Sequence, residues 1–152
     1  MDSYDSHIYE NDKTLISSVL LCAGRSSRMG QEKAFLKIGR ETAITRILNH
    51  LCPISESVTV VVSPHNFEAV KHHLFNSYLD LLNVIFAVNE KYDKGMFSSI
   101  KKGLDHAIKE KPTLLHFIDQ PFIREEVYDD LIEILDVEHD VFQPSVKIDG
   151  KY

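Results

Sequence analysis

The chain has 152 residues, the size of one domain, and its 43% hydrophobic and 26% charged residues lie near globular averages. Its formal net charge of -6 argues against non-specific nucleic-acid binding, so any polyanionic ligand must meet a local basic site. No apolar run is long enough to cross a bilayer, and the polar, acidic start does not resemble a secretory signal. We therefore expect a cytoplasmic domain at residues 14–152 behind a flexible tail at residues 1–13, with neither nucleic acid nor membrane as partner.

The first half of the chain predicts two strand–helix units. Residues 15–22 form a short apolar run before a glycine-containing loop, which is typical of a strand buried on both faces. A helix over residues 42–51 should begin at an N-cap, Thr42, and end before Pro53, with an apolar face of Ile44, Ile47, Leu48 and Leu51. Residues 57–63 are rich in β-branched residues and predict a strand, and helical spacing follows at Phe67, Val70 and Leu74.

The second half continues the alternation. Strands are expected at residues 83–88 and 113–118, and between them a helix over about residues 96–108 whose apolar face would be Met96, Ile100, Leu104, Ala107 and Ile108. After Pro121 we expect a helix with an apolar face of Val127, Leu131 and Leu135, and then a strand around residues 140–144. Strands that alternate with helices predict an α/β fold, a three-layer α/β/α Rossmann-like domain with a mostly parallel sheet.

The residues after the first strand are the first place to look for a ligand, because open parallel sheets bind ligands beyond the carboxyl ends of their strands. Ala23 and Gly24 lack bulky side chains, so backbone N–H groups can approach a phosphate closely. Arg25, Arg28 and Lys33 concentrate positive charge in an otherwise acidic chain. This segment therefore predicts a phosphate site.

Two common phosphate loops do not fit the segment. A Walker A loop needs a glycine where Met29 stands, and a dinucleotide fingerprint needs one at Ser26. The string LCAGRSSRMGQEK instead resembles the LAAGxSxRMGxxK pattern of the NTP-transferase superfamily, particularly its molybdenum-cofactor cytidylyl- and guanylyltransferases. Cys22 replaces the usual second small residue, and the match falls on Leu21, Ala23, Gly24, Ser26, Arg28, Met29, Gly30 and Lys33.

Two further segments carry the same resemblance. NEKYDKGMFSSI resembles the family segment that helps to form the base and ribose pocket, with Glu90 where proline is common. The matching residues are Asn89, Tyr92, Gly95, Met96, Ser98, Ser99 and Ile100. The third segment, IDQP at residues 118–121, resembles the family's GDQP, and the whole resemblance covers about residues 15–152.

The resemblance implies a reaction and residue roles. Arg28 and Lys33 would act in catalysis by offsetting charge on the phosphates of a bound NTP, and Asp119 would hold Mg²⁺. Arg25 would serve the acceptor side or the β- and γ-phosphates. The nucleotide pocket would comprise Leu21, Cys22, Ala23, Gly24, Arg25, Ser26, Met29, Gly30, Asn89, Gly95, Met96 and Ser99. A phosphorylated small-molecule acceptor such as molybdopterin would attack the α-phosphorus and release pyrophosphate.

The base and two alternatives remain open to test. CMP transfer is favoured over GMP transfer, because Cys22-Ala23-Gly24 is closer to the form of cytidylyltransferase relatives and the Ala23 methyl would narrow the floor beside the base. The alternatives are a catalytically silent nucleotide-binding module and a sugar-1-phosphate nucleotidyltransferase, which shares the first loop. Family members usually continue past a segment like residues 143–152 and supply a second metal-binding Asp, so the resemblance implies that the C-terminal part of the family domain is missing.

The cysteines and histidines predict no metal site. Cys22 and Cys52 lie in apolar surroundings without zinc-ligand spacing, so buried thiols are expected. The adjacent His72 and His73 would point about a third of a helical turn apart and could not converge on one ion. Solvated or half-buried side chains are expected for the eight histidines.

Overall fold

The computed structural model describes residues 16–24, 32–77 and 79–135, together with residues 141, 143 and 145. Its strands are β1 Ile16–Leu21, β2 Lys37–Ile38, β3 Glu41–Thr42, β4 Ser55–Val62, β5 Val84–Val88 and β6 Thr113–Phe117. Its α-helices are α1 Ala43–Ile54, α2 Phe67–Phe75, α3 Met96–Leu104 and α4 Glu125–Glu133, and its 3-10 helices are η1 Lys33–Phe35 and η2 Tyr92–Lys94. The tail at residues 1–13 lies outside the described residues, and so does most of the strand expected around residues 140–144.

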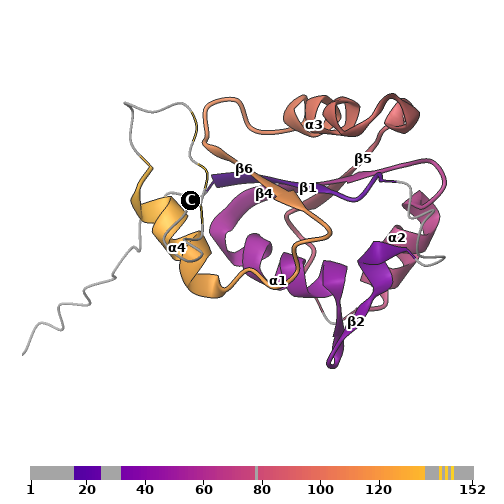
Figure 1. Ribbon diagram of the computed structural model, residues 1–152, viewed down its shortest axis with the longest axis horizontal. Coiled ribbons are helices and arrows are strands. Elements are labelled where there is room, and N and C mark those ends of the chain that lie inside the picture. The colour runs from indigo at the N-terminus through magenta and orange to yellow at the C-terminus, as the bar shows by residue number, and fades with distance from the viewer. Residues whose placement is uncertain are drawn as a thin grey trace, which may run out of the picture.

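Four strands form the central sheet in the order β5-β4-β1-β6, and every neighbouring pair is parallel. Helix α3 covers one face of this sheet, and α1, α2 and α4 cover the other (Figure 1). All six residues of β1 are buried, because the strand lies inside the sheet and between the two helical layers. The structure thus confirms the three-layer α/β fold with a mostly parallel sheet.

The two faces of the sheet carry separate apolar clusters. The larger cluster lies under α1, α2 and α4 and includes the fully buried side chains of Leu20, Ile44, Leu48, Val60 and Leu74. The smaller lies under α3 and is built from Val19, Leu21, Ala23, Val61 and Ala87. Among the described residues, no helix has the length and apolar character that crossing a bilayer requires.

Helix α1 extends further than the sequence predicts. It begins after Thr42, which forms a capping box with Thr45, and it passes through Pro53 and ends at Ile54. The next residue already has extended backbone and starts β4, so no loop separates the two elements. The side-chain amide of Asn83 donates to the carbonyl of Cys52 at 2.9 Å and thereby satisfies one acceptor that the helix end leaves open.

The apolar face predicted for α3 is wrong in part. Met96 and Leu104 are 62% and 48% exposed, and the residues that the helix buries are Ser99 and Gly103. A Cβ at Gly103 would overlap Cγ1 of Val19, so only glycine allows the helix to approach β1 this closely. The helix also ends at Leu104, before the expected residue 108.

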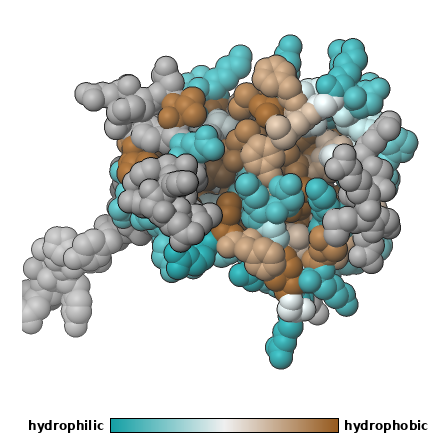
Figure 2. Space-filling model, viewed as in Figure 1, coloured by the Kyte–Doolittle hydropathy of each residue, from teal (hydrophilic) through white to brown (hydrophobic). Residues whose placement is uncertain are grey.

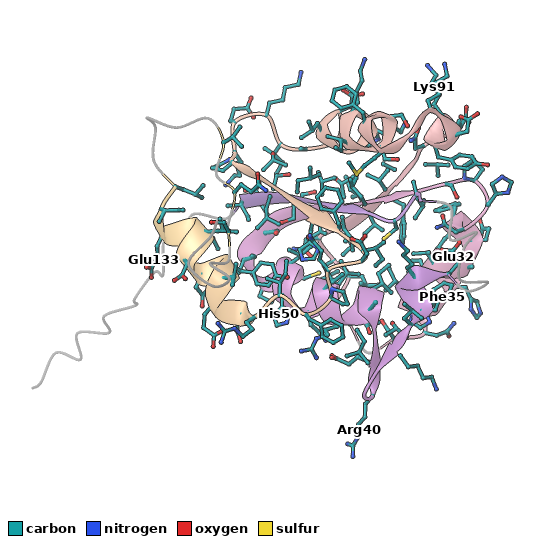
Figure 3. All side chains as sticks on the ribbon, viewed as in Figure 1. Glu32, Phe35, Arg40, His50, Lys91 and Glu133 are labelled. Carbon is teal, nitrogen blue, oxygen red and sulfur yellow. The ribbon has the colours of Figure 1, made fainter. Side chains whose placement is uncertain are left out.

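Two smaller features also differ from the sequence expectations. In α4 the buried residue is Tyr128, and the expected Val127, Leu131 and Leu135 are only partly buried. Strands β2 and β3 form an antiparallel hairpin that the sequence pattern does not predict. Gly39 turns this hairpin with a φ of 64°, and Arg40 at its tip projects away from the sheet (Figure 3).

Candidate functional site

A cleft of about 410 Å³ lies beyond the carboxyl ends of the sheet strands. The end of β1 contributes residues 21–24, and η1 with the residue before it contributes residues 32–34. The segment of η2 and α3 contributes Tyr92, Asp93, Gly95, Met96 and Ser99, and the end of β6 contributes residues 117–119. Since β1, β5 and β6 are all parallel, segments that are distant in sequence meet at this one edge.

The cleft brings together most of the predicted site residues that the structure describes. Those that line it are Leu21, Cys22, Ala23, Gly24, Lys33, Gly95, Met96, Ser99 and Asp119. Five others lie outside the described residues, and these are Arg25, Ser26, Arg28, Met29 and Gly30. The structure therefore places representatives of all three predicted segments around one cavity.

The end of β1 shapes the floor of the cleft. The side chains of Cys22 and Ala23 are buried, whereas Gly24 is exposed and a Cβ added there would meet nothing within 4 Å. Burial, and secondarily the charge of Glu32, raises the pKa of the Cys22 thiol far above its usual value. Cys22 is therefore a packing residue and no thiolate nucleophile, as the sequence predicts.

Lys33 and Asp119 face each other across the cleft. The Lys33 Nζ lies 3.9 Å from Oδ2 of Asp119, and the two side chains are 40% and 58% exposed. So exposed a pair is screened by water and contributes little to folding stability. Its significance is that a cation and a carboxylate, from η1 and from the end of β6, meet where a charged ligand could reach both.

Asn89 is buried behind the residues that line the cleft. Its buried amide donates to Oγ of Ser98 at 2.9 Å and to Oγ of Ser99 at 3.0 Å, and its Oδ1 accepts from the backbone N–H of Lys91 at 3.0 Å. These bonds orient the turn between β5 and α3. Gly95, with a φ of 95°, occupies the N-cap position and has no side chain to satisfy the first N–H groups of α3.

A buried histidine supports the end of β6. His116 donates from Nδ1 to the carbonyl of Phe117 at 3.0 Å, so its Nε2 accepts from the Tyr128 hydroxyl at 2.8 Å. Burial lowers the pKa of His116 and raises that of Tyr128 to about 12. The expectation of a solvated or half-buried side chain is wrong for His116, because these two partners satisfy both ring nitrogens.

Several lining residues are absent from the predicted site. Glu32, Asp93, Phe117 and Ile118 line the cleft, and Tyr92 does so although it was singled out only as part of a matching segment. Glu32 directly precedes Lys33, which is the one sequence signal that could have indicated it. Figure 3 shows Glu32 and Lys91 toward the same end of the sheet. Within the described part of the chain, no three His, Cys, Asp or Glu side chains are grouped to hold a metal ion.

Curated proteins resemble the chain in sequence. The chain is 27% identical over 125 residues to a probable molybdenum cofactor guanylyltransferase of Methanosarcina mazei. The aligned region covers 82% of this chain and 55% of that protein. The chain thus spans about half the length of this curated relative.

Solved structures show the same fold. Rv0371c of Mycobacterium tuberculosis H37Rv superposes with a TM-score of 0.63 at 21% identity, over 80% of this chain and 60% of that one. The 4-diphosphocytidyl-2C-methyl-D-erythritol synthase of Anaerococcus prevotii superposes with a TM-score of 0.61 at 18% identity, over 80% of this chain and 51% of that one. A second crystal structure of Rv0371c, with a TM-score of 0.58 at 19% identity over 80% of this chain and 59% of that one, is a complex with manganese.

The family follows from the extent of the match along the chain. Residues 18–149, which include all three segments that meet at the cleft, match the MobA-like NTP transferase domain. The chain belongs to the MobA-like NTP transferase family.

Proposed function

We propose that this chain binds a nucleoside triphosphate in the cleft and transfers its nucleoside monophosphate to a phosphorylated small molecule, with release of pyrophosphate. The observation that carries the proposal is the meeting of three predicted segments at one strand edge, with Lys33 and Asp119 3.9 Å apart between them. The name of the M. mazei relative suggests molybdopterin as the acceptor.

The proposed reaction is an in-line displacement. A phosphate oxygen of the acceptor forms a bond to the α-phosphorus, and the bond to the bridging oxygen breaks, so pyrophosphate leaves with the electron pair. Catalysis of this kind depends mainly on positioning and on neutralising charge. Lys33 and Arg28 have the expected role of offsetting charge on the phosphates, and Arg25 would serve the acceptor side or the β- and γ-phosphates. The open first turn of α3, after Gly95, offers N–H groups to an anion or a ribose.

The cleft suits a magnesium ion that is shared with the substrate. Mg²⁺ commonly binds one or two carboxylates and completes its shell with water and substrate phosphates. Asp119 offers one carboxylate at the mouth of the cleft. When bound there, Mg²⁺ would stabilise the negative charge that develops on the phosphates.

CTP is the proposed nucleotide. The buried Ala23 adds a methyl group to the cleft floor, which disfavours the larger purine. One methyl group shifts discrimination by only about 1 to 3 kcal/mol, so a preference of about tenfold is expected. Because the M. mazei relative is named a guanylyltransferase, the affinity for CTP is to be compared with the affinity for GTP. Side-by-side calorimetric titrations at fixed Mg²⁺ test the base, and tighter binding of GTP would assign guanylyl transfer.

Two assays test the proposal as a whole. Titration with each of the four nucleoside triphosphates measures binding, and pyrophosphate release with molybdopterin or with a sugar 1-phosphate measures turnover. Binding without release is the result expected of a silent nucleotide-binding module, and release only with a sugar 1-phosphate would identify the other alternative. No binding of any triphosphate would overturn the proposal.

Two substitutions test the residues. Lys33→Ala should weaken triphosphate binding by about 1 to 3 kcal/mol, the usual effect of losing a charge-assisted bond. Lys37→Ala, on the exposed hairpin, is the matched control and should leave affinity unchanged. Asp119→Asn should remove the Mg²⁺ dependence of binding while leaving the fold intact, and retention of that dependence would place the metal elsewhere.

A further inference from the structure

We infer that Asn66 is a positioning residue of the cleft, which holds together the two segments of chain that flank residues 25–31. It lies in the turn between β4 and α2, outside the three segments that carry the family resemblance. Its importance for nucleotide binding rests on the proposed function, whereas its effect on the geometry of the cleft does not.

One side-chain amide contacts both flanking segments. The Nδ2 group of Asn66 donates to the carbonyl oxygen of Cys22 at 2.8 Å and to Oε2 of Glu32 at 3.2 Å. Cys22 is the first residue after β1, and Glu32 directly precedes η1 and Lys33. The two hydrogens of a single NH₂ group therefore bridge the residue that follows β1 and the residue that precedes η1.

The orientation of this amide is fixed from the other side. Its Oδ1 accepts from the backbone N–H of Ser63 at 2.9 Å and from the Ser63 hydroxyl at 3.1 Å. If the side-chain amide of Asn66 were flipped, its NH₂ group would face the Ser63 N–H, and the bonds to Cys22 and Glu32 would both be lost. Asn66 is only 2% exposed, so its four bonds form away from water, where an unmade bond is costly.

The simpler explanation, that Asn66 caps α2, does not fit. Asn66 occupies the N-cap position, where an asparagine side chain ordinarily accepts from a backbone N–H of the first turn. Here the side chain makes no such bond. Its hydrogen-bonding capacity is directed instead to Ser63, Cys22 and Glu32.

The position of β4 explains why this turn can act on the cleft. Strand β4 lies between β1 and β5, so the residues after its carboxyl end adjoin the residues that follow both neighbours. Asn66 contacts the segment after β1, and the neighbouring His65 packs edge-on against Tyr92, which follows β5, with ring centroids 5.3 Å apart. By fixing Glu32, Asn66 also constrains where the adjacent Lys33 meets Asp119.

Preorganisation is the expected benefit. If Cys22 and Glu32 were not tied to one another, the described segments that carry them would lose conformational freedom when a ligand bound. Tying Cys22 and Glu32 to one buried amide removes part of that freedom in advance.

Asn66→Asp is a direct test, because it keeps the shape and the acceptor toward Ser63, removes both donors and places a carboxylate beside the oxygens of Cys22 and Glu32. We expect triphosphate affinity to fall by about tenfold or more, as for the loss of a bond to a charged group, and hydrogen exchange to accelerate at the amides of Gly24 and Lys33. Glu32→Ala, at a partly exposed position, breaks only the second bond and should produce a smaller change in the same direction. It keeps the test decisive if Asn66→Asp folds poorly.

A double variant and a matched control separate positioning from general damage. Combining Asn66→Asp with Glu32→Gln reverses donor and acceptor, so part of the lost affinity and protection should return. Ser63→Ala removes a bond to the same buried amide without a contact to Cys22 or Glu32, and it should lower stability more than affinity.

Wild-type affinity and wild-type exchange at Gly24 and Lys33 in folded Asn66→Asp or Glu32→Ala protein would overturn the inference. If the wild-type protein bound no triphosphate, the proposed function would fail separately, and the exchange measurements alone would decide the role of Asn66.

Discussion

The two faces of the central sheet are packed in different ways. Under α1, α2 and α4, large aliphatic side chains such as Leu20, Leu48 and Leu74 are fully buried. Under α3, the helix contributes Ser99 and Gly103, and Phe97 is 77% exposed. Figure 2 shows apolar side chains at the surface of the molecule over α3.

This difference separates the face that supplies most of the stability from the face that reaches the cleft. The first face buries most of the large side chains and therefore supplies most of the hydrophobic stabilisation. The second face holds α3 close to β1, and the first turn of that helix reaches the cleft through Gly95, Met96 and Ser99. Small residues on this face allow α3 to lie close to the sheet and reach the cleft, and they bury less apolar area.

The largest effect is expected from Leu48→Ala on the first face. Leu48 is fully buried, so its truncation should lower the free energy of unfolding by about 2 to 5 kcal/mol. Leu104→Ala on α3 is the matched control. This leucine is half exposed, so its truncation should lower the free energy of unfolding much less. Denaturant unfolding measures both. Equal losses would remove the distinction between the faces.

Gly103→Ala should come next. An alanine in an exposed helix would stabilise it by about 1 kcal/mol relative to glycine, but here the new methyl group would overlap Val19 and cost about 1 to 3 kcal/mol. The double variant with Val19→Ala should lose less stability than the two single variants lose in sum, since Val19→Ala removes the methyl group that the new alanine would overlap. A neutral or stabilising Gly103→Ala would show that α3 can move away from the sheet without penalty.

The His116 pair predicts a smaller, pH-dependent effect on the first face. The folded-state pKa of His116 is lowered, chiefly by burial and also by the charge of His50, so the unfolded chain binds its proton more readily. The contribution of neutral His116 is therefore fully present above the unfolded pKa of about 6.5, and it declines as pH falls from there toward the folded value.

The free energy of unfolding, measured between about pH 7 and pH 5, tests this pH dependence. The His116→Gln variant is the comparison, because glutamine cannot titrate and still offers the Tyr128 hydroxyl an acceptor. The wild type should lose more stability than the variant over this range. Identical pH profiles would contradict a lowered pKa.

The smallest effect is expected from Phe97→Ala. The Phe97 side chain is mostly exposed on α3, so its removal should change the free energy of unfolding by no more than about 0.5 kcal/mol. Thermal unfolding at low protein concentration is a suitable measurement. A loss of several kcal/mol would mean that this side chain is buried in the protein as it exists in solution.

The sequence predicts the order of elements well because each strand and helix has a local pattern. The apolar runs of β1 and β4 and the helical spacing in α1 and α2 all correspond to observed elements. The burial of α3 could not be predicted in this way, because periodicity counts large apolar residues and the contact of Gly103 with Val19 joins positions far apart in the chain.

The same distinction applies to the cleft. Its three main segments are recognisable because each follows a strand and matches a family pattern, and parallel strands bring such segments to one edge. Asn66 has no such pattern. Its partners Cys22 and Glu32 lie 44 and 34 residues away, so only the folded chain shows that one amide serves both.

The order of strands in the sheet also has a consequence for folding on the ribosome. Strand β1 is made before the other described strands, yet Ser17 pairs with Ser57 on one side and with Thr113 on the other. Pairings this distant in sequence form slowly, because a long loop must close before any contact stabilises it. The cleft cannot be completed until β6 and Asp119 have emerged, so the nascent chain would carry Cys22 and Gly24 long before the proposed nucleotide site could form.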